Sequence, residues 1–239
     1  MALILSIETS TQVCSVALFK QGEIVGLKES NDEKSHAKLL TLFIQELLLE
    51  YKIEFKDLNA IVVSKGPGSY TGLRIGVSTA KGLCYALDLP LIAINTLQSM
   101  SHGIIHRIKS DELTIPDFEN SILCPMIDAR RMEVYTAFYN SKGENIREVK
   151  AEIIDENSFS DVLTKSKIIF FGDGADKVKS TIQNPNAFFI DNIQPSASDM
   201  AVLSEQAYKK QHFEDVAYFE PFYLKDFIAT IPKKNIYTS

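Results

Sequence analysis

Short apolar runs alternate with polar turns along the first part of the chain. The runs 2–7 (ALILSI), 13–19 (VCSVALF) and 24–30 (IVGLKES) are each bounded by turn residues, which predicts three strands joined as hairpins. From residue 36 onward, longer segments with the hydrophobic period of a helix alternate with short apolar runs typical of strands. The sequence predicts a helix over 36–51, a strand over 60–64, a helix over about 71–87, a strand over 90–94 and a helix that begins near 96.

The second half of the chain repeats this order. The run 121–128 (SILCPMID) ends in an acid, as ALILSIE does, and a polar turn leads to 132–139 (MEVYTAFY). The next residues, SKGENI, match KQGEIV of the first half, and 167–174 (KIIFFGDG) repeats the order of strand and glycine turn. Helices are expected near 175–182 and 198–211. Repetition restricts the whole fold, so the sequence predicts a duplicated unit.

The repeated unit itself indicates a fold class. Three hairpin-linked strands followed by helix-crossed parallel strands form a mixed sheet with helices on its faces. Two such units side by side are typical of the actin-like (ASKHA, RNase H-like) architecture of α/β proteins, with a five-stranded sheet in each lobe. We expect an N-terminal lobe over 1–104, a C-terminal lobe over 118–224 and a partly disordered tail over 225–239.

The composition of the chain excludes several classes of protein. The net charge of −6 argues against a free-standing nucleic-acid binder, which would carry a basic excess. The three cysteines are far apart and lie in apolar stretches, so they predict buried thiols and neither a disulfide framework nor a metal knuckle. The first residues lack the basic start of a signal peptide, and no apolar run is long enough to span a membrane. We therefore expect a cytoplasmic protein.

The glycine-rich segment 66–82 (GPGSYTGLRIGVSTAKG) follows a strand and opens a helix, as phosphate-binding loops do. Its spacing fails the P-loop pattern, because Thr71 stands where the second glycine belongs. The dinucleotide fingerprint fails at the same residue. Backbone amides at the start of the helix could still take an anion.

Close helix packing is the alternative explanation of the glycines. At 3.6 residues per turn, one stripe of the helix 71–87 carries mostly small residues, which let another helix approach closely. On the helix 36–51, Leu42 and Leu49 point away from the main apolar face. Single exposed leucines are common, but two aligned ones beside a small-residue helix favour a protein interface. The predicted interface residues are Leu42, Leu49, Gly72, Gly76, Thr79, Leu83 and Ala86.

Four segments resemble one known family in the same order. ILSIETSTQVCSVAL, GPGSYTGLRIGVSTAKGL, DARRMEVY and PFYL are similar to the TsaB (YeaZ) family, over positions 3 to about 224. The resemblance implies the duplicated actin-like fold and a role in making threonylcarbamoyladenosine in tRNA. TsaB-like subunits are non-catalytic, pair with the catalytic paralogue TsaD through N-terminal-lobe helices and are joined by a TsaE-type ATPase. The implied contact with tRNA is through the complex, and the small-residue face would also permit a homodimer of the chain alone.

The catalytic paralogue binds a metal through an H-x-x-x-H motif that aligns here with Thr96 and Met100, neither of which is a suitable ligand. His102 and His106 form an H-x-x-x-H six residues later, but no acidic residue stands between them. We expect no metal site. This also counts against a metallopeptidase, an activity once assigned to relatives.

Other polar residues occupy the loops that bind phosphate in actin-like enzymes. The candidates are Glu8, Thr9, Ser10, Gly66, Gly68, Ser69 and Asp128. Active members usually carry an Asp where this chain has Glu8, which weakens the case for a working ATP site. A small-molecule kinase or ATPase therefore stays open as a second reading, and ATP or ADP in the cleft or at a partner interface stays open with it.

Overall fold

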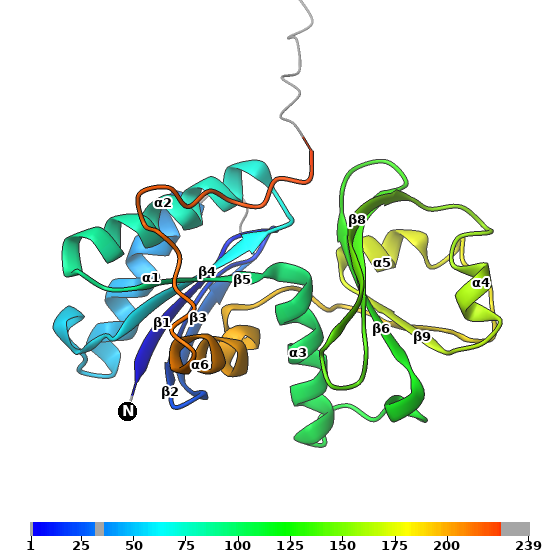
Figure 1. Cartoon of the computed structure of the whole chain (residues 1–239), viewed down its shortest axis with the longest axis horizontal. Helices are drawn as coiled ribbons and strands as arrows, with labels where there is room; N and C mark the ends of the chain where they lie inside the picture. The colour runs from blue at the N-terminus through cyan, green and yellow to red at the C-terminus, as the bar shows by residue number, and fades with distance from the viewer. Residues whose placement is uncertain (1, 32–35, 226–239) are drawn as a thin grey trace, which may run out of the picture.

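The computed structural model describes residues 2–31 and 36–225, and it contains two mixed five-stranded sheets with helices on their faces (Figure 1). The first half of the chain follows the expected order of three strands, then helix, strand, helix, strand and helix. Its elements are β1 (Leu3–Glu8), β2 (Cys14–Lys20), β3 (Glu23–Ser30), α1 (His36–Glu50), η2 (Phe55–Asp57), β4 (Ala60–Gly66), α2 (Tyr70–Leu87), β5 (Leu91–Asn95) and α3 (Thr96–Lys109).

The second half repeats the order of the first with shorter helices. The helix expected near 175–182 is shorter, with six residues, and ends at Val178. A four-residue helix over 160–163 and a four-residue strand over 187–190 also occur, at positions where the sequence pattern located no element. The elements are η3 (Phe118–Asn120), β6 (Ile122–Asp128), β7 (Glu133–Tyr139), β8 (Asn145–Ile153), α4 (Ser160–Leu163), β9 (Ile168–Phe171), α5 (Asp173–Val178), β10 (Ala187–Ile190), η4 (Ala197–Met200) and α6 (Ala201–Lys209).

The two sheets have the same topology. Their strand orders are β3-β2-β1-β4-β5 and β10-β9-β6-β7-β8, which are equivalent when the second is read in reverse. In each sheet the three hairpin-linked strands are antiparallel and the helix-crossed strands are parallel to the first. The predicted duplicated actin-like fold is confirmed.

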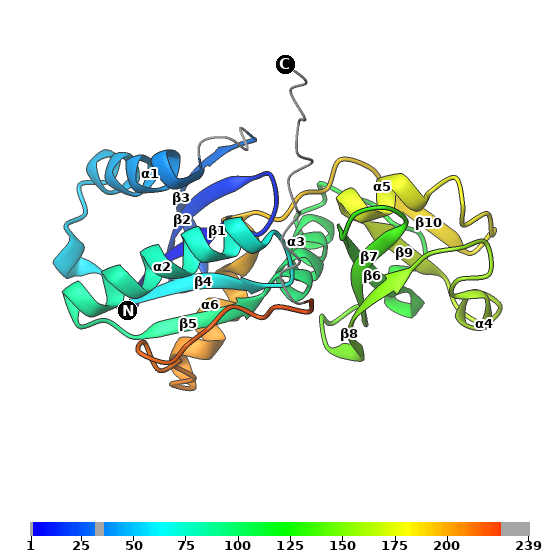
Figure 2. The same cartoon turned by 90° about the horizontal axis from the view of Figure 1, so that it is seen from above.

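The first sheet is buried on both faces because its strands alternate two apolar sets. Leu5, Ile7 and Val63 point to one face, where they pack with apolar residues of α1 and α2. Ile4 and Val62 point to the other face, where they pack with residues of η4 and α6. Figure 2 shows α1 and α2 lying side by side over the first sheet. The outer sides of these two helices are therefore left for solvent or for a partner.

The helices that follow the last strand of each half cross toward the other sheet. Met100 of α3 packs in one cluster with Ile127 of the second sheet, and Leu203 of α6 packs with Ile4 of the first. Helix α3 consequently lies between the two sheets (Figure 1). This corrects the expected C-terminal lobe over 118–224, since 197–209 covers the first sheet. An amphipathic pattern indicates that a helix buries one face but does not say against which sheet.

The segment after α6 returns along the first lobe as an extended strap. Glu214 N donates to Leu91 O at 2.8 Å, and Phe222 N donates to Lys65 O at 2.7 Å beside the glycine loop. At its end, Lys225 forms an ion pair with Glu133 of the second lobe. The strap thus contacts both lobes. The tail expected to be partly disordered was 225–239; apart from Lys225, it lies outside the described residues.

Candidate functional site

The glycine-rich loop between β4 and α2 is built on the carboxyl end of the first sheet. Gly66 has a φ of +107°, a conformation that favours glycine. Ser69 caps α2, because its side chain accepts a hydrogen bond from Gly72 N at 3.3 Å. Helix α2 then runs for 18 residues across the sheet.

The glycines make room for a loop of the same chain, the β1–β2 connection. Ser69 N donates to Ser10 O at 2.6 Å, and the Thr9 hydroxyl donates to Gly72 O at 2.8 Å. A Cβ added at Gly72 would overlap the carbonyl oxygen of Thr9, and one at Gly76 would overlap the Thr9 hydroxyl. The interface expected at Gly72 and Gly76 is therefore corrected: both are buried, and the close contact that they allow lies within the chain.

The other small-stripe residues lie nearer the surface of α2. Thr79 and Leu83 are half-buried, and Leu83 packs against the core beneath the helix. Ala86 is exposed. The stripe therefore turns from the interior at its N-terminal end toward solvent at its C-terminal end.

The phosphate-loop candidates are divided between the interior and the surface. Glu8, Thr9 and Ser10 are buried, with exposed fractions of 0%, 1% and 0%. Gly66 is buried and Gly68 half-buried, and a Cβ at Gly68 would overlap Ser10 O. The two remaining candidates, Ser69 and Asp128, are exposed and belong to different lobes.

The two acids at equivalent positions of the repeat have different surroundings. Glu8 accepts a hydrogen bond from Ser10 N at 2.6 Å through Oε1, whereas its buried Oε2 has no hydrogen-bond partner in the described part of the chain. Burial raises the pKa of the Glu8 carboxyl, and hydrogen bonds from Ser10 only partly oppose this shift. Asp128 instead forms a surface ion pair with Lys177. Of the two, only Asp128 is placed to meet a ligand from solvent.

The raised pKa of Glu8 predicts a pH-dependent stability. The folded state binds this proton more tightly than the unfolded state, so stability is lost as the pH rises from the ordinary glutamate pKa through the folded value. Glu8→Gln is expected to raise the free energy of unfolding by about 1–3 kcal/mol at pH 8 and by much less near pH 5. Urea unfolding at both pH values measures this. Glu148→Gln, which neutralises an exposed acid, should change neither value, and an equal gain at both pH values would contradict the account.

The outer face of α1 and α2 carries large exposed apolar side chains. Leu42 is 42% exposed and Leu49 81%, as their spacing predicted. Tyr85 of α2, which the sequence pattern did not single out, is 87% exposed. We call Leu42, Leu49, Gly82 and Tyr85 together the outer face. Leu49 and Tyr85 are the most exposed of the large apolar side chains that the structure describes on these two helices.

Gly82 is the unusual member of the outer face. It lies within α2, where glycine is unfavourable by about 1 kcal/mol relative to alanine. A Cβ added there would meet no atom within 4 Å, so no contact inside the described chain requires the glycine. The sequence already contained a sign of this, because Gly82 lies within the helix expected over about 71–87.

The positions of the paralogue's metal histidines are interior here. Thr96 is fully buried, and its hydroxyl lies 2.6 Å from that of Ser64. Met100 is 1% exposed and packs in the core between α3 and the second sheet. His106 is exposed, whereas His102 is half-buried and its pKa is lowered, mainly by burial. Among the residues the structure describes, no three His, Cys, Asp or Glu side chains are grouped as a metal site requires.

No helix in the described ranges is both long and apolar enough to cross a membrane.

The three cysteines are buried free thiols, and burial raises the pKa of the Cys84 and Cys124 thiols to about 12. Thiolates are the reactive form of cysteine, so none of these side chains is prepared for nucleophilic chemistry at neutral pH.

Comparisons with known proteins place the chain in a family. Residues 23–233 match the family model described as TsaD, tRNA N6-adenosine threonylcarbamoyltransferase. The TsaB protein of Buchnera aphidicola subsp. Acyrthosiphon pisum is 35% identical over 60% of each chain, so this alignment spans less than two thirds of that relative. Escherichia coli TsaB is 28% identical over 95% of this chain and 96% of its own. Both are described as tRNA threonylcarbamoyladenosine biosynthesis proteins.

A solved structure is similar to this chain over nearly its whole length. A Pseudomonas aeruginosa protein described as similar to the peptidase YeaZ superposes with a TM-score of 0.79 and 25% identity, over 94% of this chain and all of the other. The match covers both sheets. The chain belongs to the TsaB (YeaZ) family, within the larger family named for the threonylcarbamoyltransferase TsaD.

Proposed function

We propose that this chain is a non-catalytic subunit in the synthesis of threonylcarbamoyladenosine in tRNA, and that it acts by binding a TsaD-type catalytic subunit. Membership of the TsaB family supports the pathway. The buried Thr96 and Met100 support the non-catalytic part, because the paralogue's metal-binding positions here lie in the core and carry no suitable ligands.

The outer face of α1 and α2 is the docking surface in this proposal. The observation that carries it is Gly82, an exposed glycine within a helix whose missing side chain is explained by nothing in the described chain. A partner helix approaching closely would use that space. Leu49 and Tyr85 supply the large apolar contacts that dominate the energetics of interfaces. Of the other residues predicted for the interface, the exposed Ala86 extends this surface, whereas Thr79 and Leu83 are half-buried at its edge.

The same proposal includes further partners of the complex that this chain forms with the TsaD-type subunit. A TsaE-type ATPase joins the pair, and tRNA is reached through the complex, in keeping with the net charge of −6. The same face would be available for a homodimer when the partner is absent. ATP or ADP, if held in the cleft or at the interface, is contacted by residues other than the buried Glu8, Thr9 and Ser10.

A reconstituted reaction tests the function. The TsaD-type and TsaE-type subunits with threonylcarbamoyl-adenylate and tRNA should form modified adenosine only when this chain is added. Met100→Leu should retain this activity, because a volume-conserving change in the core is tolerated and no metal is held there. Modified nucleoside is measured by mass spectrometry of digested tRNA. Product formed without this chain, or by this chain alone, would contradict the proposal.

A further inference from the structure

The strap that follows α6 makes a tight turn beside α2 on its way to the second lobe. Val216 and Phe219 of this turn are partly buried and pack against the core under α1 and α2. Tyr218, between them in the sequence, is 84% exposed. Among the large apolar side chains that the structure describes, only Tyr85 of α2 is more exposed. The turn therefore fixes two side chains in the core and directs a third to solvent.

Asp215 holds the backbone of this turn. Its Oδ1 accepts hydrogen bonds from Ala217 N at 2.8 Å and from Tyr218 N at 3.2 Å, and its carbonyl oxygen accepts one from Phe219 N at 2.8 Å. An Asp side chain that accepts from the backbone two residues on is a common way to stabilise a turn. Three successive N–H groups are thus paired, which gives the turn a defined backbone conformation.

Lys81 of α2 fixes the turn to the helix. Its ammonium donates to Ala217 O at 3.1 Å and to Phe219 O at 3.0 Å, the carbonyls on either side of Tyr218. In the described part of the chain it forms no ion pair with an acidic side chain. Ordering a lysine side chain is entropically unfavourable, so two hydrogen bonds to one turn are a specific arrangement. The ordered Lys81 sets the position of Tyr218 relative to α2.

The turn lies at the border of the outer face. Tyr85 is four residues after Lys81, so the two side chains lie on the same side of α2. Lys81 therefore has one exposed tyrosine beside it on the helix and holds another on the strap. In Figure 2, α2 lies between α1 and the strap. The exposed leucines of α1 and the two tyrosines consequently lie on either side of the helix that carries Gly82.

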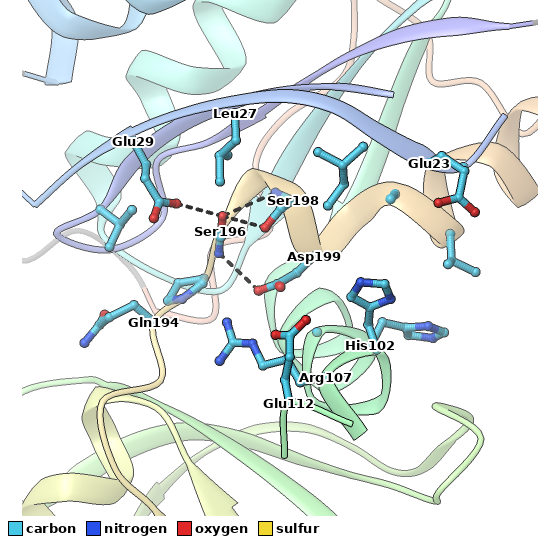
Figure 3. A pocket seen from close by; sticks show the side chains of 18 of the residues that line it. Glu23, Leu27, Glu29, His102, Arg107, Glu112, Gln194, Ser196, Ser198 and Asp199 are labelled. Carbon is cyan, nitrogen blue, oxygen red and sulfur yellow. Dashed lines mark hydrogen bonds between the residues drawn. The ribbon is translucent and has the colours of Figure 1, made fainter. Parts of the chain in front are cut away.

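The turn lines neither of two cavities in the described structure. A cavity of about 580 Å³ at the junction of the lobes is lined by side chains from β3, α3 and η4 (Figure 3). A second cavity, of about 480 Å³, lies beside β5 and reaches the strap only at 212–214. A small molecule bound in either cavity would not touch Tyr218.

We propose that Tyr218 is a contact for the TsaD-type catalytic subunit and that Lys81 is the positioning residue that holds it there; this inference rests on the proposed function. A tyrosine offers a large contact area with few torsions to fix, and tyrosines are enriched among the residues that dominate interfaces. The turn is ordered before binding, so little further entropy is lost when the contact forms. Because Tyr218 borders the outer face, a partner seated over Gly82 is the molecule that reaches it.

Isothermal titration calorimetry of the full chain with the TsaD-type subunit tests both roles. Tyr218→Ala should weaken binding about tenfold, because a large contact is removed, and should keep the fold, because the side chain is 84% exposed. Lys81→Met should weaken binding about as much, and Lys81→Arg should restore it, since arginine retains donors for the two carbonyls. Adding Lys81→Met to Tyr218→Ala should cause no further loss, because Lys81 acts through Tyr218.

Ile153→Ala is the control, since it truncates a side chain that is 76% exposed on β8, and it should bind as the wild type does. Unchanged affinity of Tyr218→Ala would overturn the inference and leave the proposed function intact. A further loss in the double variant would overturn the positioning role of Lys81. A loss confined to self-association of the chain, or to binding of a TsaE-type ATPase, would assign Tyr218 to another interface and also overturn the inference. No binding by the wild type would contradict the proposed function and the inference with it.

Discussion

Gly72→Ala is expected to destabilise the protein by about 3 kcal/mol, although alanine is the better helix former. The added Cβ would overlap the carbonyl oxygen of Thr9, and a backbone atom cannot move aside as the end of a flexible side chain can. The carbonyl belongs to the β1–β2 loop, which is itself fixed by the bond between Ser69 N and Ser10 O. Relief would require a shift of the loop or of α2.

Gly82→Ala in the same helix is the matched control. Its Cβ meets no atom within 4 Å, so the variant should gain up to about 1 kcal/mol of stability from helix propensity. Urea unfolding followed by circular dichroism compares both variants with the wild type. Similar effects of the two substitutions would show that Gly72 is not in close contact with the β1–β2 loop.

Most of the fold could be predicted from the order of the apolar runs along the chain. Strands such as 2–7 and 121–128 are short and end in turn residues, and their repetition restricted the topology. The partners of α3 and α6 were not accessible, because an apolar face is equally consistent with either sheet. β10 (Ala187–Ile190) is four residues long and only partly buried, so it gave little pattern to detect.

The site was predicted in part. Leu42 and Leu49 stood out because helical geometry placed them away from the main apolar face. Gly72 and Gly76 were correctly identified as positions of close approach, but small residues do not reveal which segment approaches. The cavity between the lobes escaped prediction altogether. Its lining comes from residues as far apart in the sequence as Glu23 and Asp199, and only the fold brings them together.

The double variant Leu49→Asp, Tyr85→Asp is expected to weaken binding to a TsaD-type subunit by about 100-fold or more. Burying either carboxylate in an apolar interface is unfavourable, and both large contacts are lost. The fold should be unaffected, because the two side chains are 81% and 87% exposed. Binding is measured by sedimentation, and circular dichroism checks the fold.

Ile153→Asp provides the control for this variant. Ile153 is 76% exposed on β8 of the second lobe, so the substitution introduces the same charge at a similarly exposed apolar position far along the chain from the outer face. Its affinity for the partner should equal that of the wild type. An equal loss in this control would indicate a general effect of charge.

Sedimentation velocity of the chain mixed with a TsaD-type subunit tests directly whether the outer face of α1 and α2 is the docking surface. We expect a 1:1 complex with the wild type and with Ile153→Asp, and separate subunits with the double variant Leu49→Asp, Tyr85→Asp. A complex that forms equally well with the double variant would place the partner elsewhere on the molecule. No complex with the wild type would contradict the proposed function itself.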